Sequence, residues 1–514
     1  MNVFNNHTLL PSFLPPDGGN WPWQVPLGPW PGGANNSTDS GGGTMTGHTI
    51  YLISQGIIHS TRLALSPVGT KEDIKLARGL YSEPWYLNAL AAHDPRVVGH
   101  KLFFSHNYQL TAIEAYMDLY FLTGEQLLLD AVMGAWAMHR DPLNGWILPG
   151  GSLAINEGDI YEAGSFHLEA GTNNAAAHRD RAHFRERRAQ SHEHAEHEHT
   201  GSHGHHHARE EGGHGVTWGG TFPTGEFCGA VFWLKLNQRL HLLDPDNETF
   251  VAEIEREVFN EGLAHIAPDG SGIRYFSFLN GMKSKPQAIS TCCEGQGTRL
   301  YGSLNEYLFS TSQAGAYIDI YAPSSFTFTG GSLTVFTDFP YGSDVRVVVA
   351  LDNPASPFDL ALRIPSWTAA ASVPILINDV PISSSGVPGS YLHLAGPWEA
   401  EQTISFVLPM ALTPQRYTGV TQYAGLVRYN FLYGPTLLAF TPAPEGGPGA
   451  WNTTLGKGGM WIPGVDPRSP DLWANPAGDE NPLHWSVLGA PGVLIQPNWE
   501  VQQTLFSAFP AFDQ

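Results

Sequence analysis

The chain has few cysteines, few basic side chains and no long apolar stretch. Its 514 residues include 3 cysteines, and 26 Lys and Arg stand against 48 Asp and Glu, which gives a net charge of −22. This acidic balance argues against nucleic acid as a partner. No run of about 18 apolar residues appears, so the sequence predicts no membrane span. The N-terminal residues lack the basic start and apolar stretch of a secretory signal, and we expect a cytoplasmic protein.

The three cysteines that are present lie at predicted helix starts. Cys292 and Cys293 belong to Thr-Cys-Cys-Glu, a capping-box pattern that precedes a helical run. Glu226 and Cys228 lie at the start of a second amphipathic run. The free N–H groups and the positive dipole end of a helix start favour a thiolate over a thiol. The sequence therefore predicts reactive cysteines at two helix N-termini.

Together these residues form a plausible zinc site. Zn²⁺ accepts tetrahedral sets of cysteine with an occasional carboxylate, and Glu226, Cys228, Cys292 and Cys293 supply four ligands. One alternative is that the cysteines are small buried apolar residues. Another is a disulfide between Cys228 and Cys292, which the odd cysteine count and the absent secretory signal disfavour.

An ordered set of motifs resembles glycoside hydrolase family 127 (GH127), whose characterised members include β-L-arabinofuranosidases. The resemblance runs from about residue 70 to about residue 440. Its motifs are Gly225-Glu-Phe-Cys228, Thr291-Cys-Cys-Glu-Gly-Gln-Gly297 with the run to Tyr307, Leu362-Arg-Ile-Pro-Ser-Trp367, Gly396-Pro-Trp398, Leu408-Pro-Met410 and Tyr433-Gly-Pro435.

The resemblance implies a retaining glycosidase in which a zinc-bound cysteine replaces the usual carboxylate nucleophile. Cys292 matches the family nucleophile, and Glu226, Cys228 and Cys293 match the remaining ligands of a Zn²⁺ cofactor. The implied fold is a multidomain α+β arrangement, with an (α/α)6 barrel followed by β-sandwich domains. The implied partner is a carbohydrate substrate.

The acid/base and one substrate contact also follow from the resemblance. The family has a glutamate shortly after a Gly-Gly pair, and here Gly150-Gly151 precedes Glu157, which we take as the proton donor. Glu162 and Glu169 remain competitors. His106 lies where the family has a sugar-contacting histidine.

The chain divides into three predicted parts. Residues 1–45 are rich in Pro, Gly and Trp and are expected to be irregular. Residues 46–312 are expected to form the helical barrel-like catalytic domain, and residues 313–514 a β-sandwich region with short strands. Helices are predicted at roughly 47–65, 71–92, 105–122, 125–139, 226–242, 247–264 and 294–309. These are too few for six helical hairpins, which leaves open a barrel that is incomplete at its N-terminal side.

Residues 172–214 contain a histidine-rich insertion, with His192-Glu-His-Ala-Glu-His-Glu-His199 and His203-Gly-His-His-His207. Histidines mixed with Glu and Gly, without fixed ligand geometry, are typical of a disordered, solvated loop. Weak binding of zinc, copper or nickel would be a side effect.

The leading hypothesis is an exo-acting retaining glycosidase for a β-L-arabinofuranoside or a related sugar. A different glycoside is the alternative among enzymes. The alternative from another class is a non-catalytic carbohydrate-binding relative whose zinc is structural. An enzyme needs an accessible Cys292 with an acid near it, whereas a structural zinc site is closed.

Overall fold

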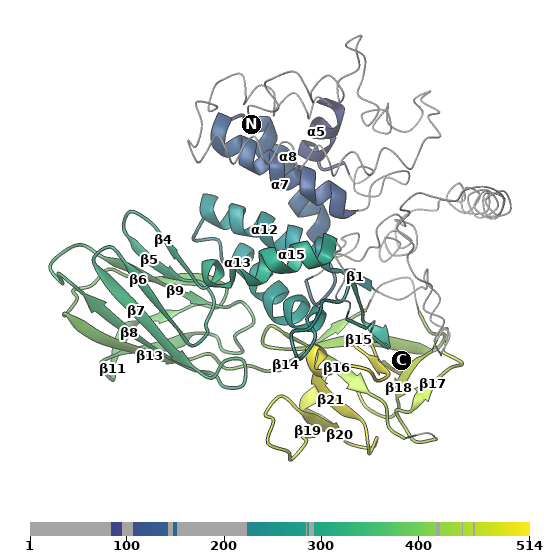
Figure 1. Cartoon of the computed structure of the whole chain (residues 1–514). Coiled ribbons are helices and arrows are strands. Elements are labelled where there is room, and N and C mark those ends of the chain that lie inside the picture. The colour runs from purple at the N-terminus through teal and green to yellow at the C-terminus, as the bar shows by residue number, and fades with distance from the viewer. Residues whose placement is uncertain are drawn as a thin grey trace, which may run out of the picture.

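The computed structural model describes residues 84–94, 106–141, 147–151, 224–283, 285–286, 292–417, 422–444, 446–455 and 458–514. The predicted acid/base candidates, the irregular segment 1–45, the helix predicted at 47–65 and the histidine-rich insertion lie outside these residues. Within them, helices come first and β-strands follow, as the sequence predicts (Figure 1).

The helices predicted at 105–122, 125–139, 226–242 and 247–264 are present within one or two residues of their expected bounds. They are α7 (His106–Thr123), α8 (Gln126–Arg140), α12 (Phe227–Leu243) and α13 (Glu248–Arg256) with α14 (Leu263–His265). Helix α5 (Pro84–Ala91) lies in the described end of the range predicted at 71–92, and α15 (Cys292–Tyr301) overlaps the range predicted at 294–309. A π-helical turn, Glu257–Gly262, joins α13 to α14 without a break. The complete barrel is not defined by the described helices and stays a prediction.

The helix predicted at 294–309 is wrong in its second half. Helix α15 ends at Tyr301, a short 3-10 turn covers Leu304–Tyr307, and the chain then enters strand β4 (Phe309–Thr311). Gly302 and Ser303 follow Tyr301, and both residue types continue a helix poorly. Of the apolar residues beyond them, Leu304 and Tyr307 lie in the 3-10 turn and Phe309 lies in the strand.

Helix α12 is the centre of the helical core. Its sequence is apolar on nearly all sides, and helices of that kind are buried. It packs against α7, α13 and α15. The Trp233 ring of α12 stacks on Trp136 of α8, with 6.4 Å between centroids. Helices α7 and α8 form a tight hairpin through Gly124, whose φ of +67° favours glycine.

The first β unit consists of two sheets packed around one core. The six-stranded sheet has the order β11-β10-β13-β8-β7-β6, and the four-stranded sheet has the order β12-β9-β5-β4. Strand β8 alternates exposed and buried side chains, as expected for a sheet with one covered face. Besides β4, the strands are β5 (Gly315–Ile318), β6 (Ser324–Phe328), β7 (Gly331–Thr337), β8 (Asp344–Leu351), β9 (Asp359–Ile364), β10 (Val373–Ile377), β11 (Val380–Gly386), β12 (Ser390–Leu394) and β13 (Glu401–Val407).

The second β unit is one continuous sheet that shares no strand with the first unit and has its own core. Of the three short strands described in the helical region, one pairs with this unit and the other two form a sheet of their own. Strand β3 (Asn280–Gly281) pairs with β22, while β1 (Thr224–Glu226) and β2 (Phe276–Phe278) pair with each other. The strands of the unit are β14 (Leu412–Arg416), β15 (Leu426–Tyr433), β16 (Thr436–Thr441), β17 (Trp451–Asn452), β18 (Gly459–Ile462), β19 (Ala474–Pro476), β20 (Trp485–Val487), β21 (Leu494–Pro497), β22 (Phe506–Ser507) and β23 (Ala511–Asp513).

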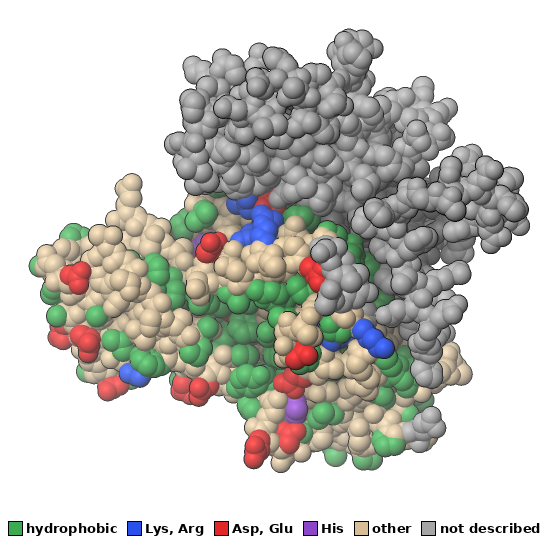
Figure 2. Space-filling model, in the orientation of Figure 1, with side chains coloured by type: hydrophobic (Ala, Val, Ile, Leu, Met, Phe, Trp, Pro, Cys, Tyr) green, Lys and Arg blue, Asp and Glu red, His purple; other side chains and the backbone are tan. Residues whose placement is uncertain are grey.

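On the face shown in Figure 2, acidic side chains are distributed over both β units. This distribution agrees with the net charge of −22. Among the described helices, none is both long enough and apolar enough to pass through a lipid bilayer.

The continuous helix Glu248–His265 joins the helical core to the first β unit through a buried ion-pair group. Arg363 on β9 is fully buried, and its guanidinium lies 2.7 Å from the Glu248 carboxylate and 2.9 Å from that of Glu255. Trp367 Nε1 donates to the same Glu255 over 2.7 Å. The Leu-Arg-Ile-Pro-Ser-Trp motif therefore has a structural explanation, because its Arg and Trp bind one helix of the catalytic region.

The same helix also contacts the second β unit. The Asn260 side chain donates to the Pro435 carbonyl and accepts from the Leu437 N–H, both over 2.8 Å. Both bonds are buried, so their loss would leave polar groups without partners. One helix therefore holds both β units in position relative to the helical core.

We predict that Arg363→Met lowers the free energy of unfolding by about 3–5 kcal/mol, because it leaves two buried carboxylates without a counter-charge. Arg468→Met is the matched control, since Arg468 pairs with Asp466 on the exposed surface and its loss should change the free energy of unfolding far less. Urea unfolding of both variants measures the difference. Equal losses would show that the buried ion-pair group does not stabilise this junction.

Candidate metal and catalytic site

The site forms where the starts of α12 and α15 meet the β1–β2 pair. In that pair Glu226 lies opposite Phe276, so the chain leaves β1 directly into α12 beside Tyr275. The Phe227 N–H, at the start of α12, donates to the Tyr275 carbonyl over 3.1 Å. The strand pairing thus fixes where α12 begins.

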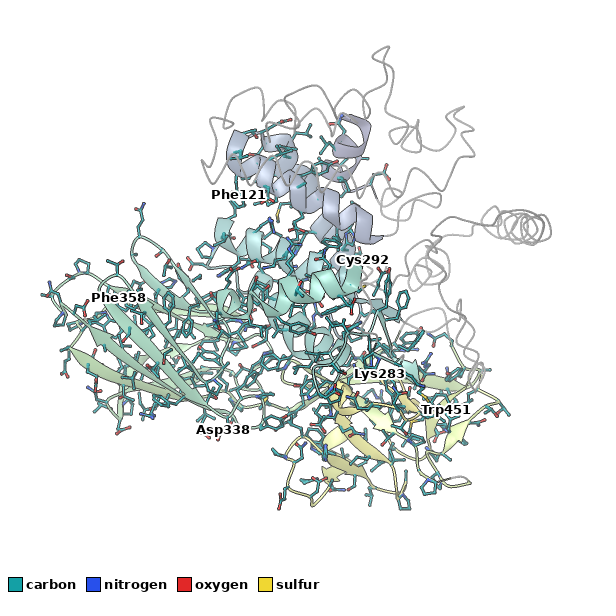
Figure 3. The ribbon with its side chains drawn as sticks, in the orientation of Figure 1. Phe121, Lys283, Cys292, Asp338, Phe358 and Trp451 are labelled. Carbon is teal, nitrogen blue, oxygen red and sulfur yellow. The ribbon has the colours of Figure 1, made fainter. Side chains whose placement is uncertain are left out.

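Four side chains converge at this point: Glu226, Cys228, Cys292 and Cys293. One ligand atom from each lies within 4.8 Å of the others. Glu226, Cys228 and Cys293 are at most 2% exposed, whereas Cys292 is exposed. Figure 3 shows Cys292 at the end of α15 that faces β1. The sequence prediction that two helix starts meet at one cluster agrees with this geometry.

The alternative of a disulfide is wrong. None of the three cysteines forms a disulfide. The Sγ atoms of Cys228 and Cys293 lie 3.2 Å apart, which is a non-bonded distance.

Close packing and ion pairs fix α15 against α12. A Cβ at Gly297 would lie 2.2 Å from the end of the Ile273 side chain and 3.2 Å from the Phe227 ring, so a larger residue would require these side chains to shift. Arg239 of α12 and Arg299 of α15 both bind the buried Glu114 of α7. A shared carboxylate therefore ties the two cysteine-bearing helices to a third helix.

Burial reverses the sequence expectation for two of the thiols. Desolvation raises the pKa of Cys228 and of Cys293 well above the usual range, and the nearby Glu226 carboxylate adds to both shifts. The helix starts are as predicted, but their dipoles do not outweigh burial in the protein without a cation. A bound cation would stabilise the ionised forms of the two buried thiols and of the carboxylate. The donor set therefore fits a thiophilic metal ion such as zinc.

Tyr275 is a site residue that sequence reasoning missed. Its hydroxyl lies 3.3 Å from Cys292 Sγ, and its carbonyl lies 3.9 Å from Cys293 Sγ. No local motif marks it, because the contact depends on β1 pairing with β2 across about 50 residues of sequence. The residues next to Cys292 in the sequence give no indication that Tyr275 belongs to the site.

A neutral histidine lies behind the cluster. The His265 ring stacks on Phe227, with 4.6 Å between centroids and 13° between planes. Burial lowers the pKa of His265 to about 3, so the ring is uncharged at neutral pH. His265 therefore adds no positive charge next to the cluster at neutral pH.

The side chains of the other predicted site residues lie outside the described part of the chain. His106 is the first residue of α7, and its side chain lies outside the described residues. Glu157, Glu162 and Glu169 also lie outside them. Their roles stay predictions.

Comparison with protein families identifies two domains. Residues 194–306 match the GH127 catalytic domain of β-L-arabinofuranosidases, and residues 315–410 match the GH127 middle domain. The first match includes Glu226, Cys228, Cys292 and Cys293, and the second covers nearly all of the first β unit. These matches confirm the predicted resemblance and the prediction of a glycoside hydrolase catalytic domain.

Solved structures share the fold at low sequence identity. A glycoside hydrolase matches with a TM-score of 0.58 and 14% identity, over 91% of this chain and 76% of its own. A GH127 β-arabinofuranosidase matches with 0.57 and 14%, over 90% and 68%. A GH127 β-L-arabinofuranosidase from Geobacillus stearothermophilus T6 matches with 0.52 and 14%, over 87% and 70%. No curated protein sequence matches the chain.

We predict one tightly bound divalent metal ion per chain after deletion of residues 175–212, which removes most of the histidine-rich insertion. Glu226→Gln and Cys228→Ser should each lower the metal content well below one, because each removes a buried ligand. Glu294→Gln is the matched control on α15, outside the four-residue cluster, and should keep the metal. Elemental analysis after dialysis measures the content. A stoichiometric metal in Glu226→Gln would contradict the proposed ligand set.

Proposed function

Because the chain carries the catalytic and middle domains of GH127, we propose that it is a retaining glycoside hydrolase with Cys292 as its nucleophile. Glu226, Cys228, Cys292 and Cys293 would hold a zinc ion. The observation that carries the proposal is the contrast in burial within the cluster. Three of its members are buried, and Cys292 alone among the four is exposed.

This contrast favours an enzyme over a structural zinc protein. A structural site encloses its ion with ligands on all sides. Here the exposed ligand is a cysteine, which is also the strongest nucleophile available at such a position. An open side at Cys292 leaves room for a reacting carbon atom beside the sulfur.

The proposed reaction has two displacements at the sugar C1 atom. A zinc ion, when bound, supplies the positive charge that favours deprotonated cysteines. Cys292 Sγ forms a bond to C1 while the bond from C1 to the leaving oxygen breaks, and Glu157 donates a proton to that oxygen. Water then attacks C1, Glu157 accepts its proton, and the bond from C1 to sulfur breaks. Two inversions give net retention.

We propose a β-L-arabinofuranoside or a related glycoside as the substrate class. Two of the solved structures that share the fold are GH127 enzymes named for β-arabinofuranoside or β-L-arabinofuranoside hydrolysis. The catalytic-domain family that residues 194–306 match is likewise named for β-L-arabinofuranosidases. His106 is proposed to contact the sugar.

Purified protein should hydrolyse an aryl β-L-arabinofuranoside, and Cys292→Ser should abolish turnover because a serine hydroxyl is a far weaker nucleophile at neutral pH. Thr298→Ala is the matched control, since Thr298 is also exposed on α15 and its hydroxyl bonds only the local Gly295 carbonyl. Release of the aryl group measures both rates, and circular dichroism checks the fold. Normal turnover by Cys292→Ser would exclude a thiolate mechanism.

The acid/base is tested by leaving-group dependence. Glu157→Gln should slow alkyl glycosides strongly and activated aryl glycosides much less, because a good leaving group needs little protonation. The same pair of substrates is compared for Glu162→Gln and Glu169→Gln, which serve as matched variants. A selective loss in one of these two, with none in Glu157→Gln, would transfer the role to that residue.

A further inference from the structure

The main chain of Tyr275 is anchored beside the start of α12. Its carbonyl accepts the Phe227 N–H over 3.1 Å and lies 3.9 Å from Cys293 Sγ. The next residue, Phe276, pairs with Glu226 in the β1–β2 ladder. A substitution that shortens only the Tyr275 side chain would therefore leave its backbone anchors in place.

The side chain of Tyr275 reaches the proposed nucleophile. Its hydroxyl oxygen lies 3.3 Å from Cys292 Sγ, and its ring packs against Phe276 with 4.5 Å between centroids. When Cys292 is a thiolate, the sulfur has no proton, so the tyrosine O–H is the donor of this bond. Hydrogen bonds to a charged partner are about twice as strong as neutral ones.

The strength of that bond changes along the reaction. In the first displacement the sulfur loses negative charge as it bonds to C1, so a donor at the sulfur gives no assistance. In the second displacement the electron pair of the C1–S bond returns to the sulfur, and negative charge develops there. A fixed donor aimed at developing charge accelerates the step in which that charge appears.

We propose that Tyr275 is a further catalytic residue, which stabilises the departing Cys292 sulfur when water releases the sugar. This inference rests on the proposed function of the site. In the release step, water forms the new C1–O bond, the acid/base accepts the proton of water, and the C1–S bond breaks with its electron pair on sulfur. Tyr275 keeps its own proton throughout and donates only a hydrogen bond, so the step is balanced without another reactant.

The assignment has a kinetic signature that a structural role lacks. Tyr275→Phe slows sugar release but not the formation of the glycosyl–cysteine bond. With an activated aryl glycoside, kcat therefore falls by about 10- to 100-fold, the range expected for a hydrogen bond to a charged group. KM falls with it, kcat/KM changes little, and the first turnover appears as a burst of aryl release.

The experiment compares wild type, Tyr275→Phe and the control Tyr301→Phe. Tyr301 lies on the same helix as Cys292, and its hydroxyl donates to the Gly262 carbonyl over 2.6 Å. Steady-state rates, burst amplitude and metal content are measured for each protein. Mass spectrometry of acid-quenched samples detects the pentosyl group on the peptide that contains Cys292.

Parallel falls in kcat and KM, with a pentosyl group accumulating on Cys292 only in Tyr275→Phe, support the proposal. An unchanged kcat in Tyr275→Phe overturns it while leaving the proposed function standing. Loss of kcat/KM together with the metal, and without accumulation, also overturns it, because Tyr275 would then act only in building the site. Normal turnover by Cys292→Ser, measured in the same assay, overturns the proposed function and this inference together.

Discussion

The confinement of a carboxylate and three sulfurs within 4.8 Å, mostly out of water, is the constraint on which the site depends. Burial favours the neutral thiols of Cys228 and Cys293, whereas metal binding needs their ionised forms. A cation resolves this conflict, and the surrounding structure pre-assembles its ligands. Gly297 permits close helix packing, and the shared Glu114 carboxylate holds Arg239 and Arg299. The chemistry of the cluster is therefore a property of two helix starts fixed against each other.

The β units contribute to the site indirectly, through one helix. Arg363 joins Glu248 and Glu255 to the first β unit, and Asn260 joins the helix to the second. The same helix ends at His265, whose ring stacks on Phe227 next to the candidate metal ligands. A family motif that lies in the β region thus serves to orient a helix of the catalytic region. This helix therefore links the segment that matches the catalytic domain to the segment that matches the middle domain.

Local patterns predicted much of the fold, and their failures have physical causes. The α12 helix and strands such as β8 follow directly from apolar spacing, because a buried helix and a half-covered strand need those patterns. Helix α15 was expected to reach 309, since the apolar period continues past Tyr301. Gly302 and the pairing of β4 with β5 override that period. The thiolate expectation is not met at Cys228 and Cys293 without a bound cation, because the helix dipole is a local effect, whereas burial depends on the whole surrounding core.

The sequence by itself determined the order of the elements, the four candidate metal ligands and the family resemblance, because these depend on residue type and short spacing. Only the tertiary structure decided that Cys292 is exposed while Cys228 and Cys293 are buried, and that Tyr275 contacts the exposed sulfur. Exposure and contact between distant segments depend on how strands and helices pack. The long-range pairing of β1 with β2 brings Tyr275 to the site and so gives the exposed cysteine its hydroxyl partner.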